Sequence, residues 1–187
     1  MEQASNDRHA TANRMRRSLV LASLFWPFAS LANMEAAETD SPLGLQRWGN
    51  GEFRRFGFLV YEATLWAGDD PQRPPLALRL DYKRRIAGSA IADASVSEMR
   101  KLGADEKMLA IWGEQMTRLF PDVASGDSLI GYYRTDGASF SFNGKPIGEI
   151  ADPEFAERFF AIWLDPKTSA PDLRVALLKR PRIDGEG

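Results

Sequence analysis

The 187-residue chain contains no cysteine and a single histidine, His9. His9 precedes the first segment with the pattern of folded structure, so the folded part cannot supply a histidine base or metal ligand. The chain therefore lacks the residues for a cysteine nucleophile, a Ser-His-Asp triad, a disulfide or a histidine metal site. Its carboxylates show no EF-hand spacing either. We expect no metal and no cofactor.

The N-terminus has the pattern of an export signal. A basic stretch with arginines at positions 14, 16 and 17 precedes the apolar run Ser18–Leu31, and a small-x-small site ends at Ala32. This pattern predicts a cleaved signal over residues 1–32, a mature start at Asn33 and an exported, periplasmic protein. An uncleaved anchor and a buried helix are the alternatives. The 14-residue run contains Pro27 and is shorter than the ~20 residues that span a bilayer, so we expect no stable membrane span. Met15 is a second candidate start codon.

The charge balance after the signal is mildly acidic. Residues 1–32 hold four of the 24 basic and two of the 26 acidic residues, so residues 33–187 carry 20 basic and 24 acidic groups, a net charge of −4. This balance argues against nucleic-acid binding, which needs a basic face. The basic run Lys83–Arg85 indicates either a solvated strand end or a site for an anionic partner.

The segment Phe53–Trp66 reads FRRFGFLVYEATLW and is rich in aromatic and β-branched residues. Such residues favour a strand, and both of its faces are mostly apolar, so we expect one central strand with both faces covered. A buried helix is the alternative. Leu45–Trp48 is expected to be a short strand, and Asn50-Gly51 is expected to be a hairpin turn that leads into the central strand.

The rest of the chain predicts one strand, then two helices, three strands and two helices. Leu76–Tyr82 alternates between leucine or tyrosine and more polar residues, as in a half-buried strand. Ser95 and Glu98 have the spacing of a capping box at a helix start, Asp105 is expected to cap the next helix, and Asp152 the one after the strands. Strands are expected over 128–134, 139–142 and 147–150, and a last helix opens at 169–171. Segregated helices and strands predict an α+β fold, an antiparallel sheet with a helical layer on one face.

Several runs resemble the bacterial exported branch of the chalcone isomerase-like family. The resemblance covers about Leu45–Lys179, and it is carried by Val60–Trp66, Leu80–Tyr82, Leu119–Leu129, Phe142–Pro166 and Thr168–Leu178. It implies an open-faced β-sandwich with a cleft between sheet and helices. The expected organisation is then a flexible lead-in over residues 33–44, a chalcone isomerase-like domain over 45–180 and a tail over 181–187.

The resemblance implies two activities. Plant members of the superfamily cyclise chalcones with the help of an arginine, a threonine and a tyrosine, whereas other members bind fatty acids without catalysis. Where the plant threonine lies, this chain has Phe56 and Gly57, and it has no tyrosine between Tyr82 and Tyr132. Arg47 is the one nearby candidate for the arginine. No catalytic residue is therefore carried over.

Aromatic residues with polar tips are the candidates for a ligand cleft. The expected ligand-binding residues are Tyr61, Arg79, Tyr82, Trp112 and Tyr133, with Tyr132 as a further candidate. Each aromatic has the alternative of being a core residue. Arg79 would meet a ligand carboxylate if the helices cover its face of the sheet; otherwise Arg79 and Asp81 form a surface pair. Phe155, Phe159 and Trp163 have the spacing of a buried helix stripe.

Three functions remain open at this point. The first is a non-catalytic domain that binds a small apolar or fatty acid-like ligand between sheet and helices. The second is an intramolecular lyase or isomerase of the chalcone isomerase type. The third is a structural or partner-binding domain with a filled cleft, whose protein partner the sequence does not identify.

Overall fold

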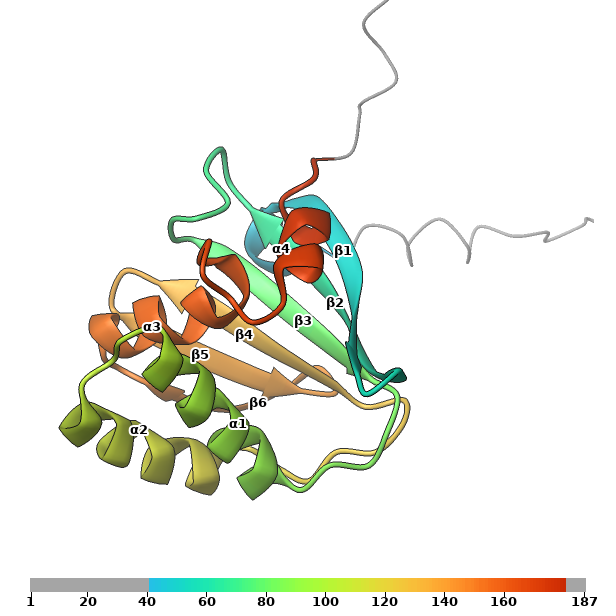
Figure 1. Cartoon of the computed structure of the whole chain (residues 1–187). Helices are drawn as coiled ribbons and strands as arrows, with labels where there is room; N and C mark the ends of the chain where they lie inside the picture. The colour runs from blue at the N-terminus through green and yellow to red at the C-terminus, as the bar shows by residue number, and fades with distance from the viewer. Residues whose placement is uncertain (1–40, 181–187) are drawn as a thin grey trace, which may run out of the picture.

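The computed structural model describes residues 41–180. They form a six-stranded antiparallel sheet whose strands pair in chain order, with four helices packed against it (Figure 1). The strands are β1 (Gln46–Arg55), β2 (Phe58–Ala67), β3 (Leu76–Tyr82), β4 (Ser128–Arg134), β5 (Gly137–Phe142) and β6 (Lys145–Ile150). The helices are α1 (Gly88–Lys101), α2 (Glu106–Leu119), α3 (Pro153–Leu164) and α4 (Pro171–Leu177), and a 3₁₀ turn precedes β1 at Pro42–Gly44.

This arrangement confirms the predicted α+β class, because the helices form one layer beside the open antiparallel sheet (Figure 1). The predicted signal peptide, residues 33–40 of the lead-in and the tail 181–187 lie outside the described residues. Within the described range, no helix is both long and apolar enough to cross a bilayer.

Strand register decides which side chains meet the helices. Leu65, Leu78, Gly131 and Phe140 are paired in one row across β2 to β5, and side chains in one row share a face. All four are buried, and this row faces the helical layer. The neighbouring row, which includes Arg79, faces away from it.

The predicted central strand Phe53–Trp66 is wrong, because the chain turns in its middle. Phe56 and Gly57 have φ angles of 51° and 80° and join β1 to β2. A two-residue turn with both φ angles positive is the favoured hairpin geometry. The fourteen residues therefore supply the end of one strand and most of the next.

The predicted turn at Asn50-Gly51 is also wrong, since both residues lie inside β1. The glycines of this stretch serve a different purpose. A Cβ on Gly51 would lie 2.8 Å from Cβ of Ala176 and 2.9 Å from Cδ1 of Leu173, and one on Gly49 would collide with the carbonyl oxygen of Ala176. Both glycines let α4 pack directly on the backbone of β1.

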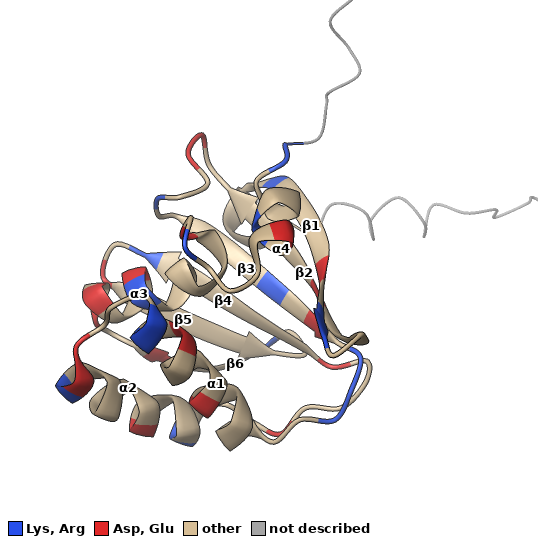
Figure 2. Cartoon of the chain, viewed as in Figure 1, with Lys and Arg blue, Asp and Glu red and all other residues tan. Residues whose placement is uncertain are grey.

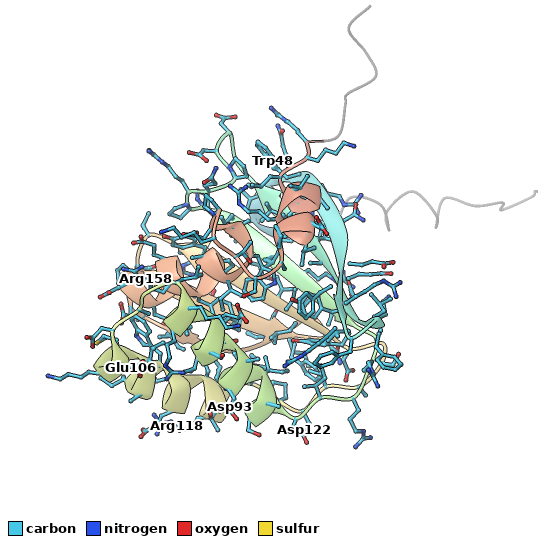
Figure 3. The ribbon with its side chains drawn as sticks, viewed as in Figure 1. Trp48, Asp93, Glu106, Arg118, Asp122 and Arg158 are labelled. Atoms are coloured by element: carbon cyan, nitrogen blue, oxygen red, sulfur yellow. The ribbon has the colours of Figure 1, made fainter. Side chains whose placement is uncertain are left out.

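The first helix begins eight residues earlier than predicted, with Ala87 rather than Ser95 at the cap position. Ser95 is 7% exposed in the middle of α1, where its hydroxyl donates to the carbonyl of Ile91 at 2.9 Å. The helix begins at Gly88, whose N–H donates to Oδ1 of Asp122 at 2.9 Å; Figure 3 labels Asp122 at this end of α1. A Cβ on Gly88 would collide with the backbone of Phe120, so this position also requires glycine.

The other helix starts agree with the sequence. Asp105 accepts hydrogen bonds from the N–H groups of Lys107 and Met108 at 2.9 and 3.3 Å, and so caps α2. Asp152 caps α3 in the same way. The predicted strands Leu76–Tyr82 and 128–134 are observed with the same bounds.

Candidate ligand-binding site

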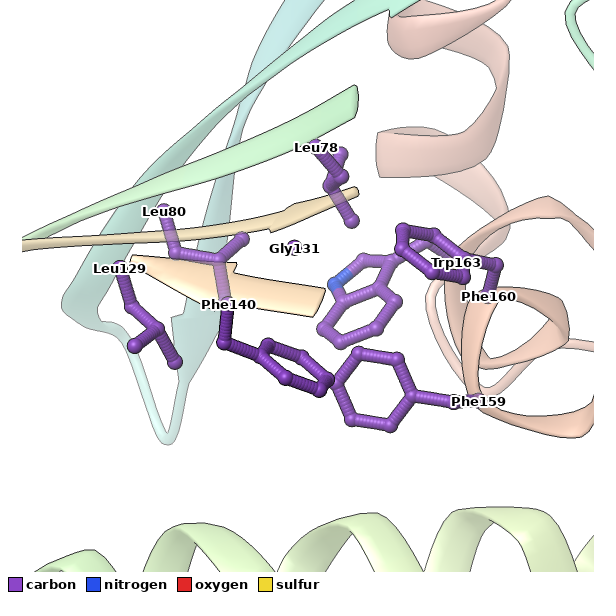
Figure 4. A pocket seen from close by; sticks show the side chains of 8 residues that line it. All are labelled: Leu78, Leu80, Leu129, Gly131, Phe140, Phe159, Phe160 and Trp163. Carbon is purple, nitrogen blue, oxygen red and sulfur yellow. The ribbon is translucent and has the colours of Figure 1, made fainter. Parts of the chain in front are cut away.

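A small apolar cavity lies between the sheet and α3 (Figure 4). Its sheet side consists of Leu78, Leu80, Leu129, Gly131 and Phe140, and its helix side of Phe159, Phe160 and Trp163. The volume is about 10 Å³, which is enough for about one water molecule. Side chains thus leave little free space at this point between the sheet and α3.

Helix α3 holds the rings on one side of this cavity. Proline at its first position and the Asp152 cap fix where the helix begins, and Phe155, Phe159 and Trp163 then recur on its buried face, as predicted. The Phe159 ring packs edge-on against Phe140 and Trp163, with centroids 5.4 and 5.3 Å apart. Packing alone holds the Phe140 and Phe159 rings, whereas Trp163 also donates a hydrogen bond to Tyr61.

Gly131 provides the space beneath these rings. A Cβ there would lie 3.1 Å from Cζ of Phe160 and 3.3 Å from Cε1 of Phe140. Even one methyl group would therefore press on both rings. The glycine lets the aromatic cluster lie directly on β4.

The Tyr61 phenol is joined to the cavity through Trp163, and Tyr82 lies next to Tyr61. Tyr61 and Tyr82 are paired across β2 and β3, and their rings are 5.9 Å apart, edge to face. The indole Nε1 of Trp163 donates to the Tyr61 hydroxyl at 3.0 Å, and Phe53 stacks on the Tyr61 ring. We call Phe53, Tyr61, Tyr82 and Trp163 the tyrosine cluster.

The two hydroxyls of the tyrosine cluster differ in their partners. The Tyr61 oxygen accepts the bond from Trp163, whereas the Tyr82 hydroxyl has no hydrogen bond within residues 41–180, although the residue is only 2% exposed. In that range, the one side-chain polar atom fully buried without a partner is Nε of Arg158. The Tyr82 oxygen therefore keeps some contact with solvent and can bond to a bound molecule.

Both phenols stay protonated at neutral pH. Burial raises the pKa of Tyr61, the bond from Trp163 opposes this rise, and the charge of Glu98 adds to it. Burial also raises the pKa of Tyr82, and Tyr61 adds to the effect. A general base works best with a pKa near the operating pH, so these groups are suited to donating hydrogen bonds rather than removing protons.

The carboxylate nearest the tyrosine cluster is held by its own partners. Glu98 on α1 accepts from the Lys101 ammonium at 2.7 Å and from the Ser169 hydroxyl at 2.6 Å. Partial burial would raise the pKa of Glu98, but these two bonds and the charges of Lys101 and Arg55 lower it. Glu98 is therefore charged at neutral pH, and no cation directly contacts the two phenols within the described residues.

Trp112 and Tyr133 lie on the helix side but apart from the tyrosine cluster. Trp112 is fully buried on α2, and its Nε1 donates to Oδ2 of Asp152 at 2.9 Å. Tyr133 stacks on Phe160, with centroids 5.2 Å apart. Trp112 joins α2 to the start of α3, and its polar atom is already bonded.

Arg79 lies on the face of the sheet that points away from the helices. It pairs with Thr64 on β2 and Ile130 on β4, and its guanidinium binds Asp81 at 2.8–2.9 Å. Tyr132, whose hydroxyl is 3.3 Å from that of Ser141, lies on the same face. Of the five residues proposed from the sequence, the structure brings together Tyr61 and Tyr82 alone.

The sequence did not indicate the residues that shape the cavity. Phe159 and Trp163 have the spacing of an ordinary buried helix stripe, and Phe140 and Gly131 lie within predicted strands. A glycine inside a strand is a usable signal, since it often marks a close approach of another group. Among the described residues no group of three potential metal ligands is found.

Comparisons with known proteins agree with this geometry. A family model described as chalcone isomerase-like matches residues 45–179. The crystal structure of a fatty-acid binding protein from Arabidopsis thaliana has a similar fold, with a TM-score of 0.57 and 13% sequence identity over 74% of this chain and 87% of that chain. No curated protein matches the sequence.

Proposed function

The chain belongs to the chalcone isomerase-like family, and we propose that it is a non-catalytic member that binds a small apolar or fatty acid-like ligand between the sheet and the helices. The Tyr82 hydroxyl carries this proposal. It is a hydrogen-bonding group without a protein partner in the described range. Its ring contacts that of Tyr61, whose hydroxyl accepts a hydrogen bond from Trp163, and Trp163 lines the apolar cavity. A ligand with one polar end and an apolar body fits this pairing.

Binding requires the rings at the cavity to move. The present volume of about 10 Å³ is far below the several hundred Å³ of an ordinary ligand site. Phe159 and Trp163 would turn or shift with α3 to admit an acyl chain. Turning Trp163 breaks its bond to Tyr61, and the ligand's polar end would then take up the hydrogen bonds of both phenols.

The polar end is expected to be a hydrogen-bond acceptor rather than a group that needs a cation. The phenols are neutral donors, and the charged Glu98 lies near Tyr61. A carboxylate would be repelled by Glu98, whereas a protonated acid, an ester or an alcohol would not. The isomerase alternative finds no support in these groups, since a raised phenol pKa disfavours acid–base work at neutral pH.

Export completes the proposal. The basic, apolar and small-x-small pattern of residues 14–32 supports a signal peptide that is removed before Asn33. On this reading the domain works in the periplasm of a bacterium.

A domain with a filled interior is the second candidate. It is favoured by one observation, the nearly complete filling of the space between α3 and the sheet. Such a domain would act through its surface, as a structural or partner-binding module, and it would not take up fatty acids.

Quenching of tryptophan fluorescence by the methyl ester of dibrominated stearic acid, which has a polar end without charge, separates the two candidates. Bromine quenches at short range, so binding beside Trp163 should quench the full chain saturably, and the quenching should be largely lost in Trp163→Phe. Tyr82→Phe should weaken the affinity about three- to tenfold, the usual contribution of one hydrogen bond. Arg79→Ala is the matched control, since Arg79 lies on the other face of the sheet, and it should bind as the parent does.

Two results would count against the ligand proposal. Absence of saturable quenching up to the solubility limit of the probe would favour the filled domain. Equal weakening by Arg79→Ala and Tyr82→Phe would place the ligand outside the tyrosine cluster.

A further inference from the structure

Two exposed phenylalanines and five basic residues gather at one end of the sheet. The β1–β2 hairpin ends there, and the chain leaving β3 lies beside it (Figure 1). Phe56 is 87% and Phe58 60% exposed, and Phe56 is the most exposed large apolar residue of the described range. We call residues 54–58 together with 83–85 the basic-aromatic tip.

The hairpin turn itself does not require a phenylalanine. Phe56 has a φ angle of 51°, in the left-handed region that bulky residues avoid. The β5–β6 turn of the same chain has nearly the same geometry, with φ angles of 49° and 76°, and uses Asn143 and Gly144. Asn-Gly is the favoured pair for this turn. Folding alone would therefore favour asparagine at position 56, so the exposed ring points to a role outside folding.

The basic-aromatic tip has more basic side chains than nearby carboxylates to pair with them. Arg54 pairs with Glu52 and Lys83 with Glu62, each at 2.8 Å. For Arg55, Arg84 and Arg85 no ion pair is seen within residues 41–180. The guanidinium carbons of Arg55 and Arg84 lie instead 5.5 and 4.8 Å from the rings of Phe56 and Phe58.

The rest of the described domain has the opposite sign. Residues 52–62 and 83–85 hold five basic and two acidic groups, whereas the other described residues hold 14 basic and 17 acidic groups. Figure 2 shows blue ribbon segments, which mark lysine and arginine positions, at this end of the sheet beside red ones, which mark acidic positions. Such an asymmetry orients the domain with the tip towards an anionic surface.

We propose that the basic-aromatic tip docks on the surface of an anionic lipid bilayer. A hairpin end with two protruding rings can place them at the level of the lipid headgroups, and the surrounding cations can bind the phosphates. The rings protrude from a convex turn rather than line a groove, so they suit a flat, soft surface better than an extended chain. The proposal does not depend on a ligand inside the domain.

Sedimentation of the full chain with sucrose-loaded vesicles tests the proposal. Vesicles of phosphatidylcholine and phosphatidylglycerol in equal parts should bind the protein, and pure phosphatidylcholine vesicles should bind it much less. Raising the salt should release it, because screening removes the attraction. The variant R84Q/R85Q should bind about fivefold more weakly for each removed charge. The control K107Q/K145Q, which removes two exposed charges elsewhere, should bind as the parent does.

A separate variant tests the contribution of the exposed phenylalanine rings to vesicle binding. Phe56→Asn creates the Asn-Gly turn that this geometry prefers, so it should keep or raise stability while vesicle binding falls several-fold. Ile111→Gln on α2, where Ile111 is 52% exposed, is the matched control. Residues 1–40 are common to all variants, so their contribution does not alter the comparison.

Because the chain has no cysteine, a single introduced cysteine can carry a dye that reports contact of the tip with the vesicle. Phe58→Cys, labelled with a polarity-sensitive dye, should brighten and shift to the blue with anionic vesicles, while dye at Ile111→Cys should not change. The proposal is overturned if anionic and neutral vesicles bind alike, if tip and control variants lose binding equally, or if the dye at position 58 does not respond.

Discussion

Tyr61 and Tyr82 allow a sharp test of the hydrogen bonding at the candidate site, because changing either one to phenylalanine removes a single oxygen. In Tyr61→Phe the indole N–H of Trp163 loses its acceptor at 3.0 Å, and Trp163 is only 6% exposed. Leaving a buried donor without a partner costs about 1–3 kcal/mol. We therefore expect the free energy of unfolding to fall by about 2 kcal/mol.

Tyr82→Phe removes no hydrogen bond within the described residues. The ring stays in place, so we expect a change within about 0.5 kcal/mol. For a domain of this size, about 2 kcal/mol corresponds to a Tm shift on the order of 8 °C, which separates the two variants clearly.

Urea unfolding of the ligand-stripped full chain, followed by circular dichroism, measures both changes. The slope of the free energy against urea should be the same in both variants, which shows that the folded and unfolded states are comparable. The reasoning is refuted if Tyr82→Phe loses as much stability as Tyr61→Phe. That result would mean that the Tyr82 hydroxyl has a stabilising partner.

Three further predictions concern the frame of the site. Gly51→Val should lose about 1–3 kcal/mol of stability through overpacking against α4. Gly68→Val should lose far less, because an added Cβ there meets open space. Hydrogen exchange in α4 should become faster in Gly51→Val alone. Asp152→Ala should lower the free energy of unfolding by about 2–3 kcal/mol, since it removes both the α3 cap and the acceptor of an indole N–H. Asp105→Ala removes a cap only and should lower it by about 1 kcal/mol. The two variants are compared by their urea unfolding midpoints. Folding lowers the pKa of Glu98. The stability that the charged carboxylate contributes is therefore present above the unfolded pKa of about 4.3 and is lost as the pH falls through the folded pKa. The free energy of unfolding of Glu98→Gln should differ from that of the parent at pH 7 and approach it near pH 3, and a difference that does not change with pH would contradict this assignment.

The sequence predicted the class and order of elements because most helix starts and strands carry local signals. Asp105 and Asp152 act as caps through their own side chains. Leu76–Tyr82 forms a strand with the predicted bounds, although it is more buried than its alternating pattern predicts. These signals do not depend on distant partners.

The wrong predictions fall where glycine meets a distant element. Gly51 and Gly88 are required by α4 and by the backbone of Phe120, respectively, and neither contact is visible in the neighbouring residues. The Asn50-Gly51 pair therefore looked like a turn. The true turn at Phe56-Gly57 carries a phenylalanine where asparagine is usual, which hid it inside an apolar run.

The candidate site could be predicted only in part for a related reason. Alternation showed that Tyr82 shares a strand face with Leu78 and Leu80 and that Tyr61 shares one with Leu65, and the structure places both tyrosines on the side that the helices cover. Which face the helices cover depends on the whole sheet, so the sequence left open whether Arg79 shares that side. The cavity arises from the contact of α3 with Gly131, a long-range contact that has no local pattern.

Native mass spectrometry of the full chain, purified without denaturation and followed by organic extraction, tests the central claim most directly. A ligand held between sheet and helices predicts a mass excess equal to an extracted lipid of the fatty acid class. The excess should persist in Arg79→Ala and fall in Tyr82→Phe. A protein that carries no such mass, and gains none when a fatty acid or its methyl ester is added in excess, would contradict ligand binding and assign the fold to a filled domain.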